Sequence, residues 1–182
     1  NLSQVGVDDR QAGGEACRYL AKNGHNNIGL IGGDRKLSYI SRLRYEGFTE
    51  AAAKAGAPFD EGHYQTSSFR IQSGYKAMKK LLARDRTLSA VFCMSDLIAI
   101  GAMRAVHEEG LRVPQDISFL GFDGIPLVDY CIPSLFSLRP APEEMADTSV
   151  SLLLRQIEHS DPPGNLALEA TLAEGESTLS LC

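Results

Sequence analysis

Four side chains of different chemistry each follow a short strand-like run of residues. They are Arg44, Phe69, Ser95 and Asp123. Arginine offers a planar fork of donors, aspartate accepts hydrogen bonds from paired hydroxyls, and phenylalanine offers a flat apolar wall. Together with the serine hydroxyl, these groups suit a polyhydroxylated or heterocyclic small molecule held by hydrogen bonds and stacking. The set contains no activated nucleophile, so it predicts binding and not catalysis.

Each of these residues also has a purely structural interpretation. Arg44 fits an exposed helix arginine, Phe69 fits a core position, and Asp123 fits an Asx turn in the sequence FDG. Ser95 and its neighbour Asp96 both fit the N-cap of a following helix. We expect Asp96 to cap the helix or brace a loop, which leaves Ser95 free to contact a ligand.

Motifs for catalysis and metal binding are missing from the sequence. The histidines are scattered without HExxH or paired-ligand spacing, and no GxSxG elbow is present. The glycines of GLIGGD follow neither the GxGxxG nor the GxxxxGK(S/T) pattern of a phosphate loop. We therefore expect no enzymatic activity, no cofactor and no bound metal. A nucleotide-dependent enzyme, a further alternative, would need a phosphate loop that the sequence lacks.

Helical and strand-like segments alternate regularly along the chain. Apolar periodicity predicts helices over Ala12–Asn23, Ser41–Ala55, Gln72–Ala83, Leu97–Glu109 and Glu143–Glu158. Strands are predicted at Asn27–Gly32, His63–Ser67, Ala90–Met94, Ile117–Gly121 and Leu135–Leu138, with a last extended pair at Ala167–Ala173 and Ser177–Leu181. The best linker candidate is Ser160–Asn165. Strong strands recur at roughly thirty residues, the spacing of βαβ units. The predicted fold is therefore α/β, an open parallel sheet flanked by helices.

The topology of such a sheet places its ligand site. Open parallel sheets bind ligands beyond the carboxyl ends of their strands, where connecting loops diverge. This rule selects Gly33–Arg44, Ser68–Phe69, Ser95–Asp96 and Asp123–Gly124. These stretches contain all four candidate side chains, Arg44, Phe69, Ser95 and Asp123.

Composition limits the class of protein. The 182 residues are 43% hydrophobic and 23% charged, close to globular averages. No apolar run reaches the ~20 residues of a membrane span, and Asn1–Arg10 lacks the pattern of a signal peptide. The cysteines are far apart, as expected of reduced thiols. We expect a cytoplasmic protein without membrane contact, and its net charge of −5 gives no general attraction to DNA.

Several phrases of the sequence resemble the LacI/GalR family of bacterial transcription regulators. Residues 7–33 (VDDRQAGGEACRYLAKNGHNNIGLIGG) are similar to a family stretch that begins with a D-N pair. SRLRYEGF resembles its R…GF motif, and AVFCMSDLIAIG resembles A-x-x-x-x-N-D-x-x-A-x-G. The phrase GLRVPQDISFLGFD, which is specific, resembles G-x-x-V-P-x-D-I-S-x-x-G-F-D. Ser95 replaces the usual Asn, Gly124 a frequent Asp, and Gly175 the usual Arg of the tail.

The resemblance implies a type I periplasmic-binding-protein-like fold, mostly its C-terminal lobe, with a ligand cleft between two lobes and a hinge of three crossing strands. Residues 1–23 would be a remnant of the N-terminal lobe and 24–138 the C-terminal lobe. Residues 139–165 would form a helix that returns to the first lobe, and 166–182 the C-terminal strands. The positions that contact the effector in that family correspond to Gln11, Ser38, Arg44, Phe69, Ser95 and Asp123.

The implied function is that of a ligand-sensing domain in a DNA-binding regulator, expected to be a repressor. The effector would be a small molecule such as a sugar or sugar phosphate. Operator DNA would be bound by a helix-turn-helix segment absent from these residues, and the protein would act as a homodimer. The alternative is a periplasmic sugar-binding protein of a transport system, which has the same fold. The FDG at Phe122–Gly124 is slightly reminiscent of that group, whereas VPQDIS is typical of the regulators.

Overall fold

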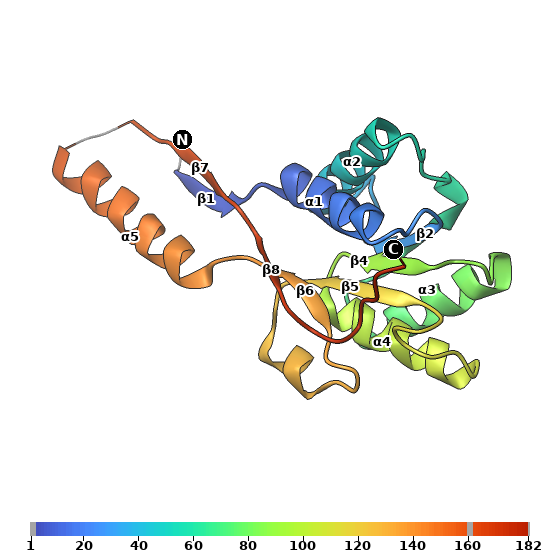
Figure 1. The fold of residues 1–182 in the computed structure, drawn as a ribbon. Helices are drawn as coiled ribbons and strands as arrows, with labels where there is room; N and C mark the ends of the chain where they lie inside the picture. Colours follow the sequence, from blue (N-terminus) through green and yellow to red (C-terminus); the bar gives the residue numbers. More distant parts are fainter. Residues whose placement is uncertain (1–2, 160–161, 182) are drawn as a thin grey trace.

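The computed structural model describes residues 3–159 and 162–181 of the chain. Its main element is a six-stranded sheet in the order β3-β2-β4-β5-β6-β8, in which β8 alone is antiparallel to its neighbour (Figure 1). The elements in chain order are β1 (Gln4–Val7), α1 (Asp9–Lys22), β2 (Ile28–Gly32), α2 (Tyr39–Lys54), η1 (Glu61–His63), β3 (Tyr64–Thr66), α3 (Ile71–Arg84), β4 (Ala90–Cys93), α4 (Asp96–Glu108), β5 (Ser118–Phe122), η2 (Pro126–Tyr130), β6 (Phe136–Arg139), α5 (Pro142–His159), β7 (Asn165–Leu168) and β8 (Thr171–Ala173). This confirms the predicted open, mostly parallel sheet flanked by helices.

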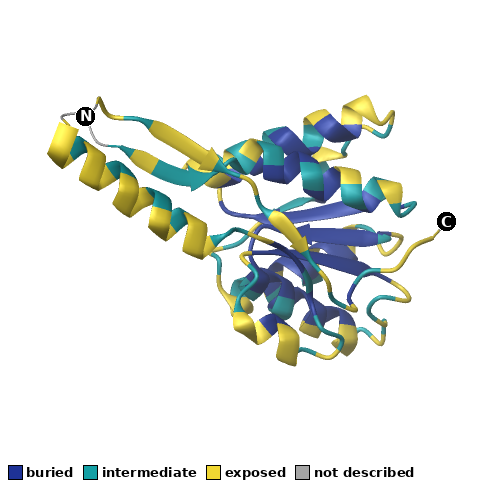
Figure 2. Ribbon diagram, turned by 60° about the vertical axis from the view of Figure 1, so that its left-hand side comes forward, coloured by how far each residue is buried: buried dark blue, intermediate teal, exposed yellow. Residues whose placement is uncertain are grey.

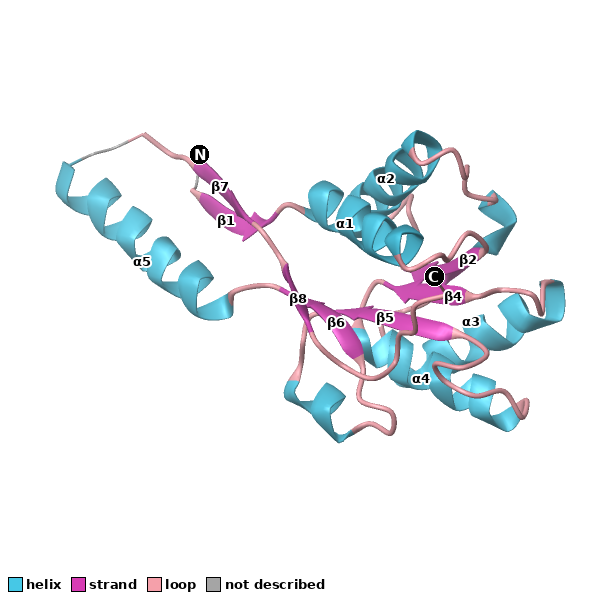
Figure 3. Cartoon of the chain, viewed as in Figure 1, coloured by secondary structure: helices cyan, strands magenta, loops and turns pink. Residues whose placement is uncertain are grey.

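Helices cover both faces of the six-stranded sheet. Successive side chains of a strand point to opposite faces of the sheet, so Val91 packs in the core on one face and Phe92 in the core on the other. The core on one face is formed with α3 and α4, and the core on the other with α1 and α2 (Figure 3). Central strands β2, β4 and β5 are buried along their whole length, as the continuous apolar runs predict. The sheet is thereby a rigid platform for the loops at its carboxyl edge.

A smaller second lobe extends from this platform. Strands β1 and β7 pair in parallel as a separate two-stranded sheet, and α5 packs beside β1. Three stretches of chain join the two lobes: the end of β1 to α1, β6 to α5, and β7 to β8. Helix α5 has no buried residue, and Figure 2 shows it almost entirely exposed. Its Val150, Leu153, Leu154 and Ile157 are among the exposed large hydrophobic residues.

Two expectations about the chain ends are wrong. Helix α1 was assigned with residues 1–23 to the N-terminal lobe, but its Ala16 and Leu20 are buried in the core of the large lobe against α2. The stretch Ser177–Leu181 forms no strand, because its backbone and side chains bond to several different elements. The predicted linker Ser160–Asn165 falls partly on residues 160 and 161, which lie outside the described residues.

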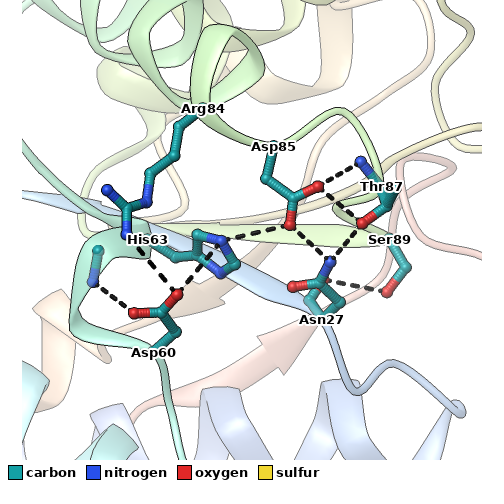
Figure 4. A network of polar contacts seen from close by, with 8 residues as sticks. Asn27, Asp60, His63, Arg84, Asp85, Thr87 and Ser89 are labelled. Atoms are coloured by element: carbon teal, nitrogen blue, oxygen red, sulfur yellow. Dashed lines mark hydrogen bonds and ion pairs between the residues drawn. The ribbon is translucent and has the colours of Figure 1, made fainter.

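A polar network fixes the edge of the sheet at the amino ends of its strands (Figure 4). Asn27 donates to Asp85 at 3.0 Å and to Thr87 at 2.9 Å, and His63 lies 3.3 Å from the same aspartate. Hydrogen bonds from Asn27 and Thr87 hold the pKa of Asp85 down to about 2. The network therefore joins the start of β2, the edge strand β3 and the connection from α3 to β4. Among the described residues, no helix is both long and apolar enough to cross a membrane.

Candidate functional site

Arg44 is the most constrained of the predicted site residues. It lies in α2, is only 6% exposed, and its guanidinium carbon is 3.4 Å from the centroid of the Phe122 ring. Its Nε donates to Oδ1 of Asp9 at 2.8 Å, and its Nη1 donates to the carbonyl oxygen of Met94 at 2.7 Å. Burial lowers the pKa of Arg44, while the charge of Asp9 opposes that effect. The interpretation of Arg44 as a solvent-exposed helix residue is wrong.

Asp123 and Ser95 lie beside each other at the carboxyl ends of β5 and β4. Ser95 is 5% exposed and its hydroxyl makes no hydrogen bond that caps α4. It lies instead close enough to the carboxylate of Asp123 to lower the pKa of that group. Burial raises the pKa of Asp123, and both the Ser95 hydroxyl and the charge of Arg44 counteract the increase. These three residues form one compact group whose charged side chains come from different elements.

Asp96 braces the loop that carries Asp123. Its carboxylate accepts from the Ser137 hydroxyl at 2.7 Å and from the backbone N–H of Ile125 at 2.9 Å. Asp96 is fully buried, and desolvation raises its pKa to about 6. The prediction that Asp96 caps the helix or braces a loop agrees with this geometry, and the predicted ligand contact of Ser95 stays a prediction.

Phe69 and Asp123 share an unusual backbone geometry. Their φ angles are 56° and 109°, and in the described part of the chain they are the non-glycine residues with a positive φ. This region is rarely populated by residues with a side chain, and such strain is frequent at functional sites. The ring of Phe69 lies against Gly33, where an added Cβ would come within 2.7 Å of the ring.

The remaining two predicted residues lie at the periphery. Ser38 is the N-cap of α2, and its hydroxyl accepts from the backbone N–H of Ser41 at 3.2 Å. The Gln11 side chain donates to Glu169 at 2.9 Å, in the stretch that joins β7 to β8. The structure thus brings Arg44, Ser95 and Asp123 together, while Gln11 contacts the chain between the lobes.

A cleft of about 580 Å³ separates the two lobes next to Arg44. Its walls are the start of α2, the β1–β7 sheet and the first turn of α5. The residues that line it include Asp8, Asp9, Tyr39, Ile40, Leu43, Arg44, Met145, Leu166 and Ala167. Its volume is in the range of small-molecule sites, and it combines apolar walls with a few charged groups. Its chemistry is that of hydrogen bonding to hydroxyls, because Arg44 donates and the carboxylates accept.

Sequence reasoning missed Asp9 as a site residue. Asp9 follows Asp8, whose carboxylate accepts from the backbone N–H of Gln11 at 2.8 Å and so caps α1. Two adjacent aspartates are typical of the N-terminus of a helix, so the sequence gives no separate sign that Asp9 pairs with Arg44. Within residues 3–159 and 162–181, no cluster of His, Cys, Asp or Glu could hold a metal ion.

The family model described as "Periplasmic binding protein-like domain" matches residues 17–178. The HTH-type transcriptional repressor PurR of Pasteurella multocida is 37% identical over 142 residues, which are 78% of this chain and 42% of that protein. The HTH-type transcriptional repressor CytR of Escherichia coli K12 is 34% identical over 157 residues, 86% of this chain and 46% of that protein. The chain thus spans less than half of the length of either repressor.

Solved structures of regulators have the same fold. The complex of the transcriptional regulator CelR with cellobiose is 32% identical with a TM-score of 0.90, covering 97% of this chain and 54% of that one. A sugar-binding transcriptional regulator of the LacI family from Escherichia coli, complexed with phosphate, is 30% identical with a TM-score of 0.88, covering 96% and 62%. The chain therefore belongs to the periplasmic binding protein-like domain family, and the relatives it resembles are transcriptional repressors and a LacI-family regulator.

Proposed function

We propose that this chain is the ligand-sensing part of a LacI-type transcriptional repressor and binds its effector in the cleft between the two lobes. The observation that carries the proposal is a cleft of about 580 Å³ lined by Arg44 and Asp9, with Asp123 close enough to Arg44 for their charges to interact. A ligand that spans the cleft would favour one relative position of the lobes. That preference would be transmitted to operator DNA through a DNA-binding segment outside these residues, by a reciprocal coupling.

A sugar-like molecule is the effector that this chemistry supports. At the cleft Arg44 donates, Asp8 and Asp9 accept, and Tyr39 and Ile40 give an apolar wall. The related CelR structure holds cellobiose, and the Escherichia coli relative is described as sugar-binding. The same residues bind without reacting, since no side chain among them is arranged as a nucleophile with a base.

The relatives favour a regulator over a transport protein. Both curated relatives are transcriptional repressors, and the structural neighbours with TM-scores of 0.90 and 0.88 are transcriptional regulators. The proposal accordingly places the protein in the cytoplasm, where operator DNA is located.

We further propose that the protein acts as a homodimer through the outer face of the large lobe. Ile132 and Tyr130 are 98% and 82% exposed, next to a groove of about 560 Å³. Leu111, Val113, Cys131 and Pro133 line this groove together with Met103. Arg104, His107, Arg112 and Gln115 add charged and polar groups to its walls. A surface that combines exposed apolar side chains with polar ones is typical of a protein–protein interface, and a second copy of the chain would cover it.

Thermal denaturation with a panel of sugars and sugar phosphates tests the sensing proposal, using the protein expressed from its complete gene. An effector at 100 times its Kd stabilises the folded state by about 2.7 kcal/mol. Arg44→Ala and Asp123→Ala are expected to abolish this increment, whereas Lys76→Ala, at an exposed position of α3, leaves it unchanged. An increment that survives both site substitutions would show that the effector binds elsewhere.

A further inference from the structure

A second groove lies on the opposite flank of α2 from the cleft. Arg42, Tyr45 and Glu46 line it from the helix, at positions half a turn away from Ile40, Leu43 and Arg44 of the cleft. The turn of residues 34–36 and strand β3 complete its walls, and its volume is about 530 Å³. The groove and the cleft share no lining residue, so a ligand in one is separate from a ligand in the other.

Arg35 is held in this groove with its charge in a fixed position. Its guanidinium carbon lies 4.0 Å from the centroid of the Tyr45 ring and 4.7 Å from that of Tyr64. The two rings meet edge to face at 5.3 Å, which leaves the guanidinium between two aromatic faces. Its Nη2 donates to Glu61 at 2.7 Å, and the Glu61 side chain is 72% exposed. An arginine placed in this way loses little conformational freedom when it binds an anion, and a glutamate at the surface is readily displaced.

Two further cations at this groove have no acidic partner. Lys36 and Arg42 are exposed, and neither forms an ion pair within 4.0 Å with a carboxylate in the described part of the chain. The two carboxylates that line the groove each have a contact outside the three cations' side chains. Asp34 accepts from the backbone N–H of Lys36 at 2.8 Å, and Glu46 lies 3.5 Å from Arg10. The groove therefore carries two cationic side chains, Lys36 and Arg42, that can donate to an added anion without first leaving a carboxylate.

We propose that this groove is a binding site for a small phosphate monoester, distinct from the effector cleft. Arg35, Lys36 and Arg42 would donate to the phosphate oxygens, with the planar guanidinium of Arg35 suited to a bidentate contact. The Thr66 hydroxyl, which also lines the groove, adds a neutral donor. A dianion with several acceptor oxygens matches three cationic groups better than a single carboxylate does. The ligand class follows from this donor set and does not depend on the identity of the effector.

Titration of the protein with inorganic phosphate, followed by two-dimensional amide NMR, tests the proposal. Amides of residues 34–36, of Arg42, Tyr45 and Glu46, and of residues 64–66 are expected to shift, while Ala167 and Met145 in the cleft do not. Glycerol phosphate and glucose phosphate then show whether a monoester binds more tightly than the free ion. The double variant Lys36→Gln with Arg42→Gln is expected to weaken binding on the order of tenfold or more, since it removes two charge-assisted hydrogen bonds.

A matched control keeps the change in charge constant. Lys54→Gln with Lys80→Gln removes the same two positive charges from exposed positions outside the groove, and its affinity for phosphate should equal that of the unmodified protein. Arg44→Ala should also retain phosphate binding, which separates this proposal from that for the effector. Equal weakening by both double variants, shifts confined to the cleft, or no shift at tens of millimolar phosphate would each overturn the proposal.

Discussion

Arg44 of α2 and Asp9 at the start of α1 form a buried ion pair, with 2.8 Å between Nε and Oδ1 and side chains that are 8% and 13% exposed. The pair joins two helices of one lobe at the edge of the cleft and holds the guanidinium over Phe122. A buried charge is tolerated only with partners of this kind. The same contact therefore serves stability and keeps Arg44 in place for a ligand.

Removing one partner of this pair is expected to be strongly destabilising. Asp9→Ala leaves Arg44 buried with its charge uncompensated on that side, and such losses cost about 3 kcal/mol. Urea denaturation of Asp9→Ala, Arg44→Met and the double variant measures the effect, and the double variant should be more stable than Asp9→Ala alone. The exposed pair of Arg18 and Glu15 is the control, and Glu15→Ala should hardly change the urea midpoint.

Glycines allow α1 and α2 to approach closely, and one of them has a matched neighbour. A Cβ at Gly13 would lie 2.0 Å from the backbone oxygen of Arg44, whereas one at Gly14 would meet only the flexible Arg18 side chain at 3.1 Å. Gly13→Ala is expected to destabilise the fold by about 2 kcal/mol through overpacking. Gly14→Ala should be neutral or stabilising by up to about 1 kcal/mol, because alanine is the better helix former. Equal urea midpoints for the two variants would contradict the close approach.

The sequence predicted the strands better than the partners of each element. The runs NIGLIG and AVFCM are continuously apolar and end at glycine or polar residues, so both predicted strands agree with β2 and β4 to within a residue. The apolar stripe of α1 showed that one face is buried but not which lobe buries it, and the assignment to the N-terminal lobe was wrong. Periodicity describes one element at a time, whereas packing depends on its neighbours.

The candidate site was predicted in part for the same reason. Arg44, Ser95 and Asp123 follow strand ends, where the topology of a parallel sheet brings side chains together. Asp9 is 35 residues from Arg44, and nothing in the spacing predicts that pair. Ser177 begins the stretch that the sequence predicts as the second part of a last extended pair. Its hydroxyl instead donates to the Phe119 carbonyl and accepts from the Phe136 N–H, bonds that sequence patterns do not reveal.

The buried carboxyl of Asp96 is expected to make stability depend on pH. Its pKa of about 6 lies above the value of 3.8 for the free side chain, so the folded state binds this proton more tightly than the unfolded state does. Its contribution to stability is complete below about pH 4 and is lost as the pH rises through 6, on the order of 3 kcal/mol in total. Urea denaturation from pH 5 to 7 measures the slope.

Asp96→Asn is the control for this slope. Burial lowers the pKa of His25, which gives the opposite dependence on pH, but that histidine is present in both proteins. The difference in unfolding free energy between the unmodified protein and Asp96→Asn should therefore change steadily from pH 5 to 7, in favour of the variant at the higher pH. A difference that is constant over this range would contradict the raised pKa.

Exposed apolar side chains on the outer face of the large lobe, among them Ile132, are expected to hold two copies of the chain together as a dimer. Ile132→Glu places a charge at the centre of the proposed interface and should shift the population from dimer to monomer in sedimentation velocity. Leu37 is a matched control because it is 87% exposed on the turn before α2, away from the groove. Leu37→Glu should leave the dimer unchanged. Monomers in the unmodified protein at tens of micromolar would contradict the homodimer.

Because the backbone at Asp123 is strained, replacing this residue is expected to lower effector affinity without lowering the stability of the fold. Its φ of 109° is unfavourable for a residue with a side chain, and burial of its carboxylate adds a further cost. Asp123→Gly removes the backbone strain and the cost of burying the carboxylate. The variant loses the favourable contact with Ser95, and ordering a glycine costs about 0.5–1 kcal/mol of conformational entropy. The variant should be at least as stable as the unmodified protein in urea while losing effector affinity in calorimetry. Asp123→Asn keeps the side-chain volume and tolerates the backbone, so a partial loss of affinity is expected there. If Asp123→Gly instead unfolds more readily and still binds the effector, then this residue serves the fold and not the ligand.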